Sequence, residues 1–279
     1  MYKYFLSGFD LDQETAELIA GRVRAETLQQ GTYGYRFSLS EKLTTDETVG
    51  IGEDYECDIL NLPLEFNPDD VKLVISDMDS TFIAIECIDE IADFAGKKTE
   101  VSQVTERAMR GELDFAASLT ARVSLLADLP ASVLDQVYEQ RLTLNPGAHE
   151  LVQQLKKHQI KFALVSGGFT SFTKRLETEF ELDYTRANKL EISNNKLTGK
   201  VLGDIIGAEA KQAYLLELCR QLNISPQQTI ALGDGANDLK MMQQAGLSVA
   251  YRAKPTVQQQ ANCALNHSGL DAVLNLLSL

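Results

Sequence analysis

The chain has 279 residues, of which 44% are hydrophobic and 24% charged. That length suits one domain of about 200 residues with a smaller one beside it, and the composition excludes a wholly disordered chain. Lysine and arginine number 26 against 40 aspartates and glutamates, which gives a net charge of −14; because affinity for nucleic acids and anionic membranes comes mainly from basic residues, we expect neither as a partner.

The first 66 residues are predicted to form a small α/β domain that ends in an acidic linker. Strands are expected near residues 2–6 and 33–38, with a helix over residues 15–28 between them. Residues 41–70 contain ten acidic residues and one basic residue. This stretch is interpreted as an exposed, solvated connection to the rest of the chain.

Residues 67–279 are predicted to form a doubly wound, Rossmann-like α/β domain. Short β-branched runs, each ended by small or acidic residues, are typical of strands buried on both faces of a parallel sheet. These runs cover residues 71–75, 161–165, 229–232 and 247–250. Helical patterns alternate with them, at residues 146–158, 169–181, 209–222 and 237–245. Such alternation favours a parallel sheet covered by helices.

One stretch interrupts this alternation. Between Glu86 and Arg141 the sequence predicts only helices, at residues 88–94, 101–110, 115–126 and 131–141. Because an insertion of about 55 residues is too long for an ordinary loop, we predict a helical cap at about residues 84–144. Further along, a β-hairpin is predicted from residues 190–193 and 196–199 around Asn194-Asn195.

The sequence contains no feature that indicates export. No apolar run approaches the roughly 18 residues of a membrane span, and Met1–Ser7 lacks a long apolar segment. The four cysteines are scattered, which is typical of reduced thiols rather than of a disulfide framework. We therefore expect a cytoplasmic protein.

The segment Asp77-Met78-Asp79-Ser80-Thr81 directly follows the first strand of the large domain. The carboxyl ends of strands in an open α/β sheet are where ligands bind. Two carboxylates at i and i+2 can face the same side of an extended segment, and they repel unless a cation or a proton lies between them. The same residues would also suit a helix N-cap or a solvated turn.

A hydroxyl and two glycines stand between a predicted strand and a helix in Val165-Ser166-Gly167-Gly168-Phe169. Backbone N–H groups at such a helix start can bind an anion, and glycine permits close approach. An ordinary strand–helix turn is the alternative interpretation.

A further acidic turn follows another strand in Gly233-Asp234-Gly235-Ala236-Asn237-Asp238. Asp234 and Asp238 offer hard oxygen ligands suited to Mg²⁺, whereas a glycine-rich turn with an Asx cap is the alternative. Lys211, like Glu86 and Arg122, could be a solvated surface charge. Together, however, a phosphate held by Mg²⁺, lysine and backbone N–H groups and attacked by a carboxylate would use every one of these elements.

In this order the motifs resemble those of the haloacid dehalogenase (HAD) superfamily of phosphotransferases, over about residues 71–275. Asp77–Thr81 is similar to the first motif, Ser166 to the second, Lys211 to the third and Gly233–Asp238 to the fourth. Within the superfamily, the similarity is strongest to the phosphoserine phosphatases; it lies in the segments Ile85–Ala92, Met109–Phe115, Ser118–Val123 and Ser166–Phe169.

The resemblance implies the catalytic and metal-binding roles. Asp77 would be the nucleophile that becomes an aspartyl phosphate, and Asp79 would protonate the leaving oxygen and then activate water. Mg²⁺ would be bound by the Asp77 carboxylate, the Asp79 backbone carbonyl and Asp234. Asp238 would support the metal site or orient Lys211.

The resemblance also implies how substrate is held. Ser166, the Gly167 N–H and Lys211 would bind the phosphoryl oxygens, with Asn237 near the phosphate. In the cap, Glu86 would meet the ammonium group of O-phospho-L-serine and Arg122 its carboxylate, while Phe115 would exclude water. The implied substrate-binding residues are thus Glu86, Phe115, Arg122, Ser166, Gly167, Lys211 and Asn237.

The implied activity is Mg²⁺-dependent hydrolysis of O-phospho-L-serine, the last step of serine biosynthesis. Two alternatives stay open: a phosphatase for another small phosphomonoester, in which Glu86 and Arg122 are ordinary helix charges, and a non-catalytic sensor of a phospho-ligand. Residues 1–65 are interpreted separately as a regulatory unit, for feedback sensing or for contact in a homodimer.

Overall fold

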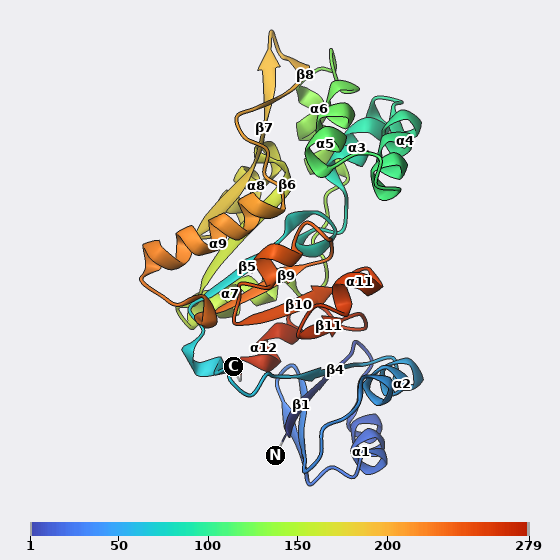
Figure 1. Cartoon of the computed structure of the whole chain (residues 1–279), viewed down its shortest axis with the longest axis vertical. Helices are drawn as coiled ribbons and strands as arrows, with labels where there is room; N and C mark the ends of the chain where they lie inside the picture. Colours follow the sequence, from blue (N-terminus) through green and yellow to red (C-terminus); the bar gives the residue numbers. More distant parts are fainter. Residues whose placement is uncertain (1, 278–279) are drawn as a thin grey trace.

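The computed structural model describes residues 2–277 and contains two β-sheets (Figure 1). The smaller sheet has the strand order β2-β3-β1-β4, and all its pairings are antiparallel. Its elements follow in the order β-α-β-β-α-β, which is the ferredoxin-like arrangement: β1 (Tyr2–Ser7), α1 (Gln13–Arg22), β2 (Thr27–Gly31), β3 (Gly34–Leu39), α2 (Thr45–Tyr55) and β4 (Asp58–Asn61).

The prediction of an exposed connection over residues 41–70 is wrong for much of its length, because α2 and β4 lie there. A capping box between Thr44 and Glu47 starts the helix. Strand β4 pairs with β1 and buries Leu60 completely. Strand pairing and burial therefore determine the secondary structure of this segment more than its acidic composition does.

The predicted helix over residues 15–28 is also too long. Helix α1 ends at Arg22, and residues 27–31 form the edge strand β2 instead. Arg24 has a φ of 56°, a left-handed conformation that ends the helical path. Strand β2 is mostly exposed and contains few apolar residues, so periodicity gives it no strand signal.

The larger sheet has seven strands in the order β11-β10-β9-β5-β6-β7-β8. All neighbours are parallel except β7 and β8, which form the predicted hairpin. Its strands are β5 (Leu73–Ser76), β6 (Lys161–Phe169), β7 (Tyr184–Ser193), β8 (Lys196–Leu202), β9 (Thr229–Gly233), β10 (Leu247–Tyr251) and β11 (Cys263–Leu265). After β5, the chain adds β6, β7 and β8 on one side of this strand and then β9, β10 and β11 on the other. The topological switch point therefore lies between β5 and β9.

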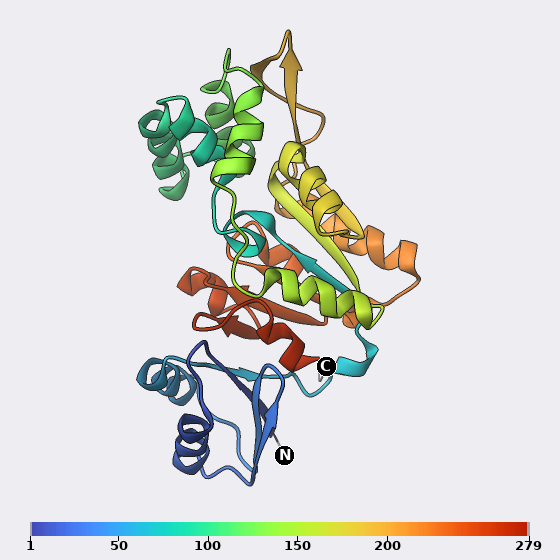
Figure 2. The ribbon, with the colours of Figure 1, turned by 180° about the vertical axis from the view of Figure 1, so that it is seen from behind.

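Helices cover both faces of this sheet, as the doubly wound prediction required. In β5, Val74 faces one hydrophobic cluster while Leu73 and Ile75 face another, which explains the continuous apolar run. Helix α9 lies in front of the sheet in Figure 1, and α7 lies in front of it in the opposite view of Figure 2. The helices are α7 (Ala148–Lys157), α8 (Thr170–Glu179), α9 (Ala208–Leu222), α10 (Leu239–Met242), α11 (Pro255–Gln258) and α12 (Ala272–Leu276), with short turns η1 (Pro68–Asp70), η2 (Met78–Phe82) and η3 (Pro226–Gln228).

The four helices predicted between residues 86 and 141 are confirmed. They are α3 (Cys87–Phe94), α4 (Lys98–Met109), α5 (Phe115–Ser124) and α6 (Ser132–Gln140). They gather beside the β7–β8 hairpin at one end of the molecule, and the small sheet lies at the other end (Figures 1 and 2). Helix α5 contacts β8 directly. The core with its helical cap therefore has the α/β architecture expected from the sequence.

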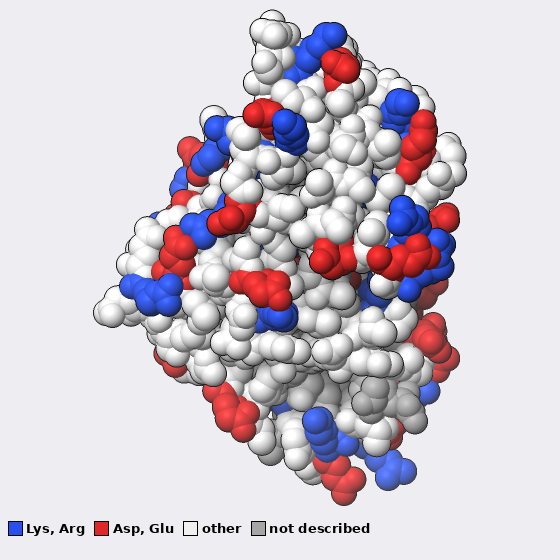
Figure 3. All heavy atoms as spheres, turned by 45° about the horizontal axis from the view of Figure 1, so that its top comes forward, with Lys and Arg blue, Asp and Glu red and all other residues white. Residues whose placement is uncertain are grey.

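The surface seen from the cap side carries basic and acidic side chains interspersed rather than one broad basic patch (Figure 3). Exposed charged side chains of the protein also form ion pairs, such as Arg175 with Asp135 and Glu139. Within residues 2–277, no helix combines the length and the apolar character that crossing a bilayer requires.

Candidate active site

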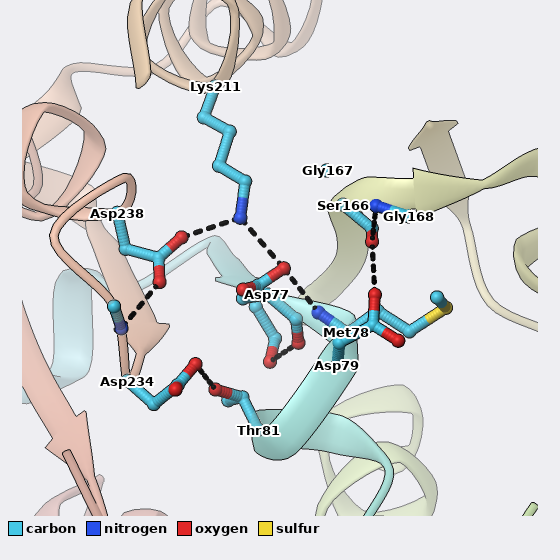
Figure 4. Close-up of polar contacts among 12 residues, drawn as sticks. Asp77, Met78, Asp79, Thr81, Ser166, Gly167, Gly168, Lys211, Asp234 and Asp238 are labelled. Atoms are coloured by element: carbon cyan, nitrogen blue, oxygen red, sulfur yellow. Dashed lines mark hydrogen bonds and ion pairs between the residues drawn. The ribbon is translucent and has the colours of Figure 1, made fainter. Parts of the chain in front are cut away.

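Side chains from four separate segments converge where β5, β6 and β9 end at their carboxyl termini (Figure 4). Asp77 follows β5, Ser166 lies in β6, Lys211 lies in the first turn of α9, and Asp234 follows β9. The backbone N–H of Asp77 donates to the carbonyl of Leu232 in β9 over 3.0 Å. Adjacent parallel strands thus bring these motifs together at the switch point.

Lys211 is fully buried and lies between two carboxylates (Figure 4). Its Nζ is 2.7 Å from Oδ1 of Asp77 and 2.6 Å from Oδ1 of Asp238. Oδ2 of Asp238 accepts a hydrogen bond of 3.0 Å from the N–H of Gly235, so both oxygens of Asp238 are engaged. Asp238 can therefore orient Lys211 toward Asp77.

Charge is unbalanced within this cluster. Burial alone would lower the pKa of Lys211, but the carboxylates of Asp238 and Asp77 outweigh burial and raise it, so the lysine stays protonated. Burial and the neighbouring Asp238 raise the pKa of Asp77 well above its usual value, and Lys211 only partly opposes them. One lysine does not neutralise all the carboxylates.

Asp234 completes a group of carboxylates that fits a metal ion. One oxygen each of Asp77, Asp234 and Asp238 lie within 4.8 Å of one another. Burial, followed by the charge of Asp238, raises the pKa of Asp234 to about 6, and the Thr81 hydroxyl donates to its Oδ1 over 3.1 Å. A set of mutually repelling oxygen donors is what a hard divalent cation such as Mg²⁺ prefers.

Asp79 is held by a second set of hydrogen bonds. The Ser166 hydroxyl donates to its Oδ2 over 3.1 Å, and the N–H of Cys87 donates to its Oδ1 over 2.9 Å. Ser166 also accepts from the N–H of Gly168 over 2.7 Å. Burial raises the pKa of Asp79, which favours a carboxyl that can hold and return a proton.

The cap reaches the core through Phe115. A Cβ placed on Gly167 would lie 2.7 Å from the ring carbon Cζ of Phe115, and one on Gly207 would lie 3.3 Å from Cδ1. The aromatic ring therefore lies directly over the backbone of these two glycines. A position of this kind can restrict the access of water to the turn after β6.

The other two cap candidates present charged groups. The Ser80 hydroxyl donates to Oε1 of Glu86 over 2.7 Å. Glu86 keeps contact with solvent, yet the protein packed around it and the charge of Asp79 raise its pKa to about 8. The Nε of Arg122 is buried and has no hydrogen-bond partner among residues 2–277, which leaves a donor for an acceptor from outside the chain.

Comparison with known proteins identifies the family. A family model described as haloacid dehalogenase-like hydrolase matches residues 71–246. The chain belongs to the haloacid dehalogenase-like hydrolases. A phosphoserine phosphatase from Polaromonas sp. is 55% identical to it over 213 residues, which make up 75% of this chain and 90% of that protein.

Solved structures of related hydrolases agree in fold. The unliganded crystal structure of a probable phosphoserine phosphatase from Vibrio cholerae has a TM-score of 0.86 and 40% identity, and the match covers 99% of this chain and 86% of that one. A substrate-bound phosphoserine phosphatase complex has a TM-score of 0.70 and 38% identity, covering 74% of this chain and 98% of that one.

Among the candidates, the structure brings Asp77, Asp79, Ser166, Lys211, Asp234 and Asp238 into one cluster. Asn237 lies in the same acidic turn, where its side chain folds over Gly235: a Cβ there would be 2.2 Å from Oδ1 of Asn237. No hydrogen bond links Asn237 to Asp77 among residues 2–277. Its place near the phosphate stays a prediction, as do the roles of the other candidates.

Two further hydrogen-bonding residues of this hydrolase were not predicted from the sequence. Thr81 lies inside the first motif and donates to Asp234. Asn188 in β7 is buried; its Nδ2 donates to the Gly167 carbonyl, and its Oδ1 accepts from the N–H of Ile206, both over 2.8 Å. A polar residue inside an otherwise ordinary strand was the available signal for Asn188.

Proposed function

We propose that this hydrolase is a phosphoserine phosphatase, which converts O-phospho-L-serine and water into L-serine and phosphate. The observation that carries the proposal is the contact between Asp77 and Lys211 beside Asp234, at the carboxyl end of the central strand. The similarity to phosphoserine phosphatases, at 55% identity over 213 residues for the Polaromonas protein, supports the choice of substrate.

Phosphate binding is assigned to groups at two strand ends. Lys211 supplies a permanent positive charge, and Ser166 and the N–H of Gly167 are proposed as donors to the phosphoryl oxygens. The side-chain amide of Asn188 donates a hydrogen bond to the Gly167 carbonyl, which keeps this turn in one conformation. Positive charge is needed because a carboxylate must approach an anionic phosphate.

The first half-reaction is proposed to begin at Asp77. Its Oδ1 is occupied by Lys211 and by the N–H of Met78, whereas no residue among 2–277 donates a hydrogen bond to its Oδ2. A carboxylate oxygen attacks phosphorus, the bond from phosphorus to the serine oxygen breaks, and Asp79 gives its proton to that oxygen. L-serine leaves, and Asp77 carries the phosphoryl group.

The second half-reaction returns both carboxylates to their starting state. Asp79, now ionised, accepts a proton from a water molecule that attacks phosphorus. The bond between phosphorus and the Asp77 oxygen breaks, and phosphate is released. The raised pKa of Asp79 suits both steps, because the group must lose and regain a proton.

The metal is proposed to be Mg²⁺, held by the carboxylates of Asp77 and Asp234 and by the backbone carbonyl of Asp79, while Asp238 orients Lys211. The bound ion would stabilise negative charge on the phosphoryl oxygens. Oxygen-only donors and the crowding of carboxylates support a hard cation.

Substrate selection is assigned to the cap. The Glu86 carboxylate would bind the substrate ammonium, and the unpartnered Nε of Arg122 would bind its carboxylate. Phe115 over Gly167 would restrict water during the first half-reaction. A substrate that lacks the amino acid part would lose both contacts and be hydrolysed less efficiently.

Release of phosphate from a panel of phosphomonoesters tests the proposal. Wild-type protein should prefer O-phospho-L-serine, Arg122→Ala should reduce that preference most, and Asp77→Asn should lose turnover. Wild-type turnover in Asp77→Asn would contradict the nucleophile. Preference for another ester would favour a phosphatase that acts on a different small phosphomonoester. A lack of metal-dependent turnover on every ester would favour a non-catalytic sensor of a phospho-ligand.

The proposal extends to the setting of the enzyme. We propose that it acts in the cytoplasm at the last step of serine biosynthesis and that residues 1–66 form a domain separate from residues 67–279, with a role in regulation or in a homodimer. Deletion of residues 1–66 tests the last point: unchanged kinetics and an unchanged sedimentation mass would contradict it.

A further inference from the structure

The two chain segments that connect the cap to the core run side by side. Ile83 and Leu144 form an antiparallel bridge. The N–H of Ala84 donates to the Thr143 carbonyl over 2.9 Å, and the N–H of Asn145 donates to the Phe82 carbonyl over 3.0 Å. The cap is therefore joined to the core by a short two-stranded ribbon.

The side chain of Asn145 lies at the base of this ribbon and is only 5% exposed. Its Nδ2 lies 2.8 Å from the carbonyl oxygen of Thr81, 3.1 Å from that of Ile83 and 3.2 Å from that of Ser80. A single amide group thus serves three carbonyls. Its loss would take a donor away from all three carbonyls, and a buried polar group that loses its partner is costly.

The carbonyls converge because the chain turns back at Ser80. Its φ of 58° is left-handed, and neither Asp79 nor Ser80 has helical backbone angles. A non-glycine residue in this region stores strain and needs support from its surroundings. Asn145 provides such support, although it follows the cap in the sequence whereas Ser80 precedes it.

This turn carries two hydroxyl groups that donate to carboxylates of the candidate site. The Thr81 hydroxyl donates to Asp234, and the Ser80 hydroxyl donates to Glu86. A shift of the turn would therefore displace the partner of a proposed metal ligand together with the partner of the proposed ammonium-binding carboxylate. Among residues 2–277, no hydrogen bond links Asn145 to either carboxylate.

We propose that Asn145 is a positioning residue, which fixes residues 80–83 so that the metal-binding and ammonium-binding carboxylates keep their arrangement. The inference rests on the proposed function for the identity of the ligands. Its geometric basis is the contact of one buried amide with three carbonyls that belong to the turn.

The test compares Asn145→Ala and Asn145→Ser with wild-type enzyme, at a temperature where all remain folded. Asn145→Ser keeps one hydrogen-bond donor, so it can be measured if Asn145→Ala does not fold. Asn275→Ala is the matched control, because Asn275 is 1% exposed, donates to the Leu6 carbonyl and accepts from Arg36, away from the cap ribbon.

In Asn145→Ala we expect KM for O-phospho-L-serine to rise about tenfold, as expected for loss of a buried donor that orients a binding group. KM for a simple aryl phosphate should rise less, because that ester has no ammonium group. Mg²⁺ binding, measured by calorimetry without substrate, should weaken severalfold. Asn275→Ala should lose stability while KM and Mg²⁺ affinity stay unchanged.

A double-mutant cycle separates positioning from general support of the fold. If Asn145 acts through the turn, Ser80→Ala should raise KM in the wild-type background and add little in Asn145→Ala. Additive effects of Asn145→Ala and Ser80→Ala, or a lower stability with unchanged KM and Mg²⁺ affinity, would overturn the inference. Failure of wild-type enzyme to hydrolyse O-phospho-L-serine would instead overturn the proposed function, and the Mg²⁺ titrations would still test Asn145.

Discussion

The ammonium group of Lys211 lies 2.7 Å from Oδ1 of Asp77, and the two side chains are 0% and 8% exposed. A buried ion pair gains less than its Coulomb energy because both charges lose water, but removal of one partner leaves the other uncompensated. Here Lys211 also compensates Asp238, at 2.6 Å. Its loss would leave three carboxylates together, since Asp234 belongs to the same group.

We therefore expect Lys211→Met to reduce the free energy of unfolding by about 3–5 kcal/mol and to abolish turnover. Urea unfolding in the absence of divalent ions measures the first effect. Lys240→Met is the control: Lys240 pairs with Glu209, but their side chains are 50% and 78% exposed, so we expect a change below about 1 kcal/mol. Equal stability of the two variants would contradict the role of Lys211.

Gly168→Ala should inactivate the enzyme through a steric effect. A Cβ at this position would lie 2.4 Å from Oδ2 of Asp79 and 3.0 Å from Oγ of Ser166, closer than van der Waals contact allows. The proposed proton donor would have to move. We expect kcat to fall by at least about a hundredfold, because small displacements of reacting groups have effects of this size.

The matched control for Gly168→Ala is Gly21→Ala, where no atom lies within 4 Å of the added methyl group and the residue lies inside α1. This change should stabilise the protein by about 0.5–1 kcal/mol and leave kcat unaltered. Phosphate release and thermal unfolding measure both variants. A fully active Gly168→Ala would show that Asp79 needs no fixed position.

The parts of the fold that the sequence predicted are those in which local pattern and tertiary burial agree. Strands β5, β9 and β10 are buried at every residue, so their apolar runs are continuous and easily recognised. The residues of β2, β4 and β11 lie at sheet edges and number five, four and three. Short edge strands depend on pairing with distant segments, which local sequence does not encode.

The same distinction applies to the active site. Motifs at strand ends predicted the convergence of Asp77, Ser166 and Asp234, because parallel strands align their carboxyl ends. The contacts of Asn145 and Asn188 were not predicted, because their partners are backbone carbonyls and N–H groups of remote turns. A hydrogen bond to backbone leaves no sequence signature at the partner residue.

Glu86 should make substrate selection depend on pH. The protein packed around Glu86, which nevertheless keeps contact with solvent, and then the charge of Asp79 raise its pKa to about 8, so the carboxyl is neutral below that pH and ionised above it. Only the ionised form attracts the substrate ammonium. We expect kcat/KM for O-phospho-L-serine to rise between about pH 7 and about pH 9 relative to that for an ester without an amino group.

Glu86→Gln should lower kcat/KM for O-phospho-L-serine and flatten this relative rise. Glu100→Gln changes the same charge on α4 of the cap, where Glu100 pairs with Lys97 at the surface, and should keep the wild-type profile. Steady-state kinetics on both esters across this range provide the measurement. An unchanged profile in Glu86→Gln would remove Glu86 from ammonium recognition.

Asp58 joins the small sheet to the large one. It lies in β4, is 4% exposed, and accepts hydrogen bonds from the backbone N–H groups of Asn266 and His267, which follow β11; the shortest is 2.8 Å. Asp58→Ala would leave both N–H groups unpaired in a buried contact. We expect a loss of about 2–4 kcal/mol in unfolding free energy and faster proteolysis of residues 1–61.

The size of this loss should depend on pH. Burial raises the pKa of Asp58 above its usual 3.8, although the hydrogen bonds from Asn266 and His267 oppose that rise. The folded state therefore binds the proton more tightly than the unfolded chain, so stability from this group is complete below about pH 4 and declines as pH rises through the raised pKa.

Urea unfolding of wild-type protein and Asp58→Ala at several pH values measures this dependence. The difference between their free energies of unfolding should become smaller as pH rises. Asp54→Ala, at the exposed pair with Arg22, should cost less than about 1 kcal/mol. A difference between wild type and Asp58→Ala that grows with pH would show that Asp58 is stabilised as the ionised carboxylate, with the backbone N–H groups outweighing burial.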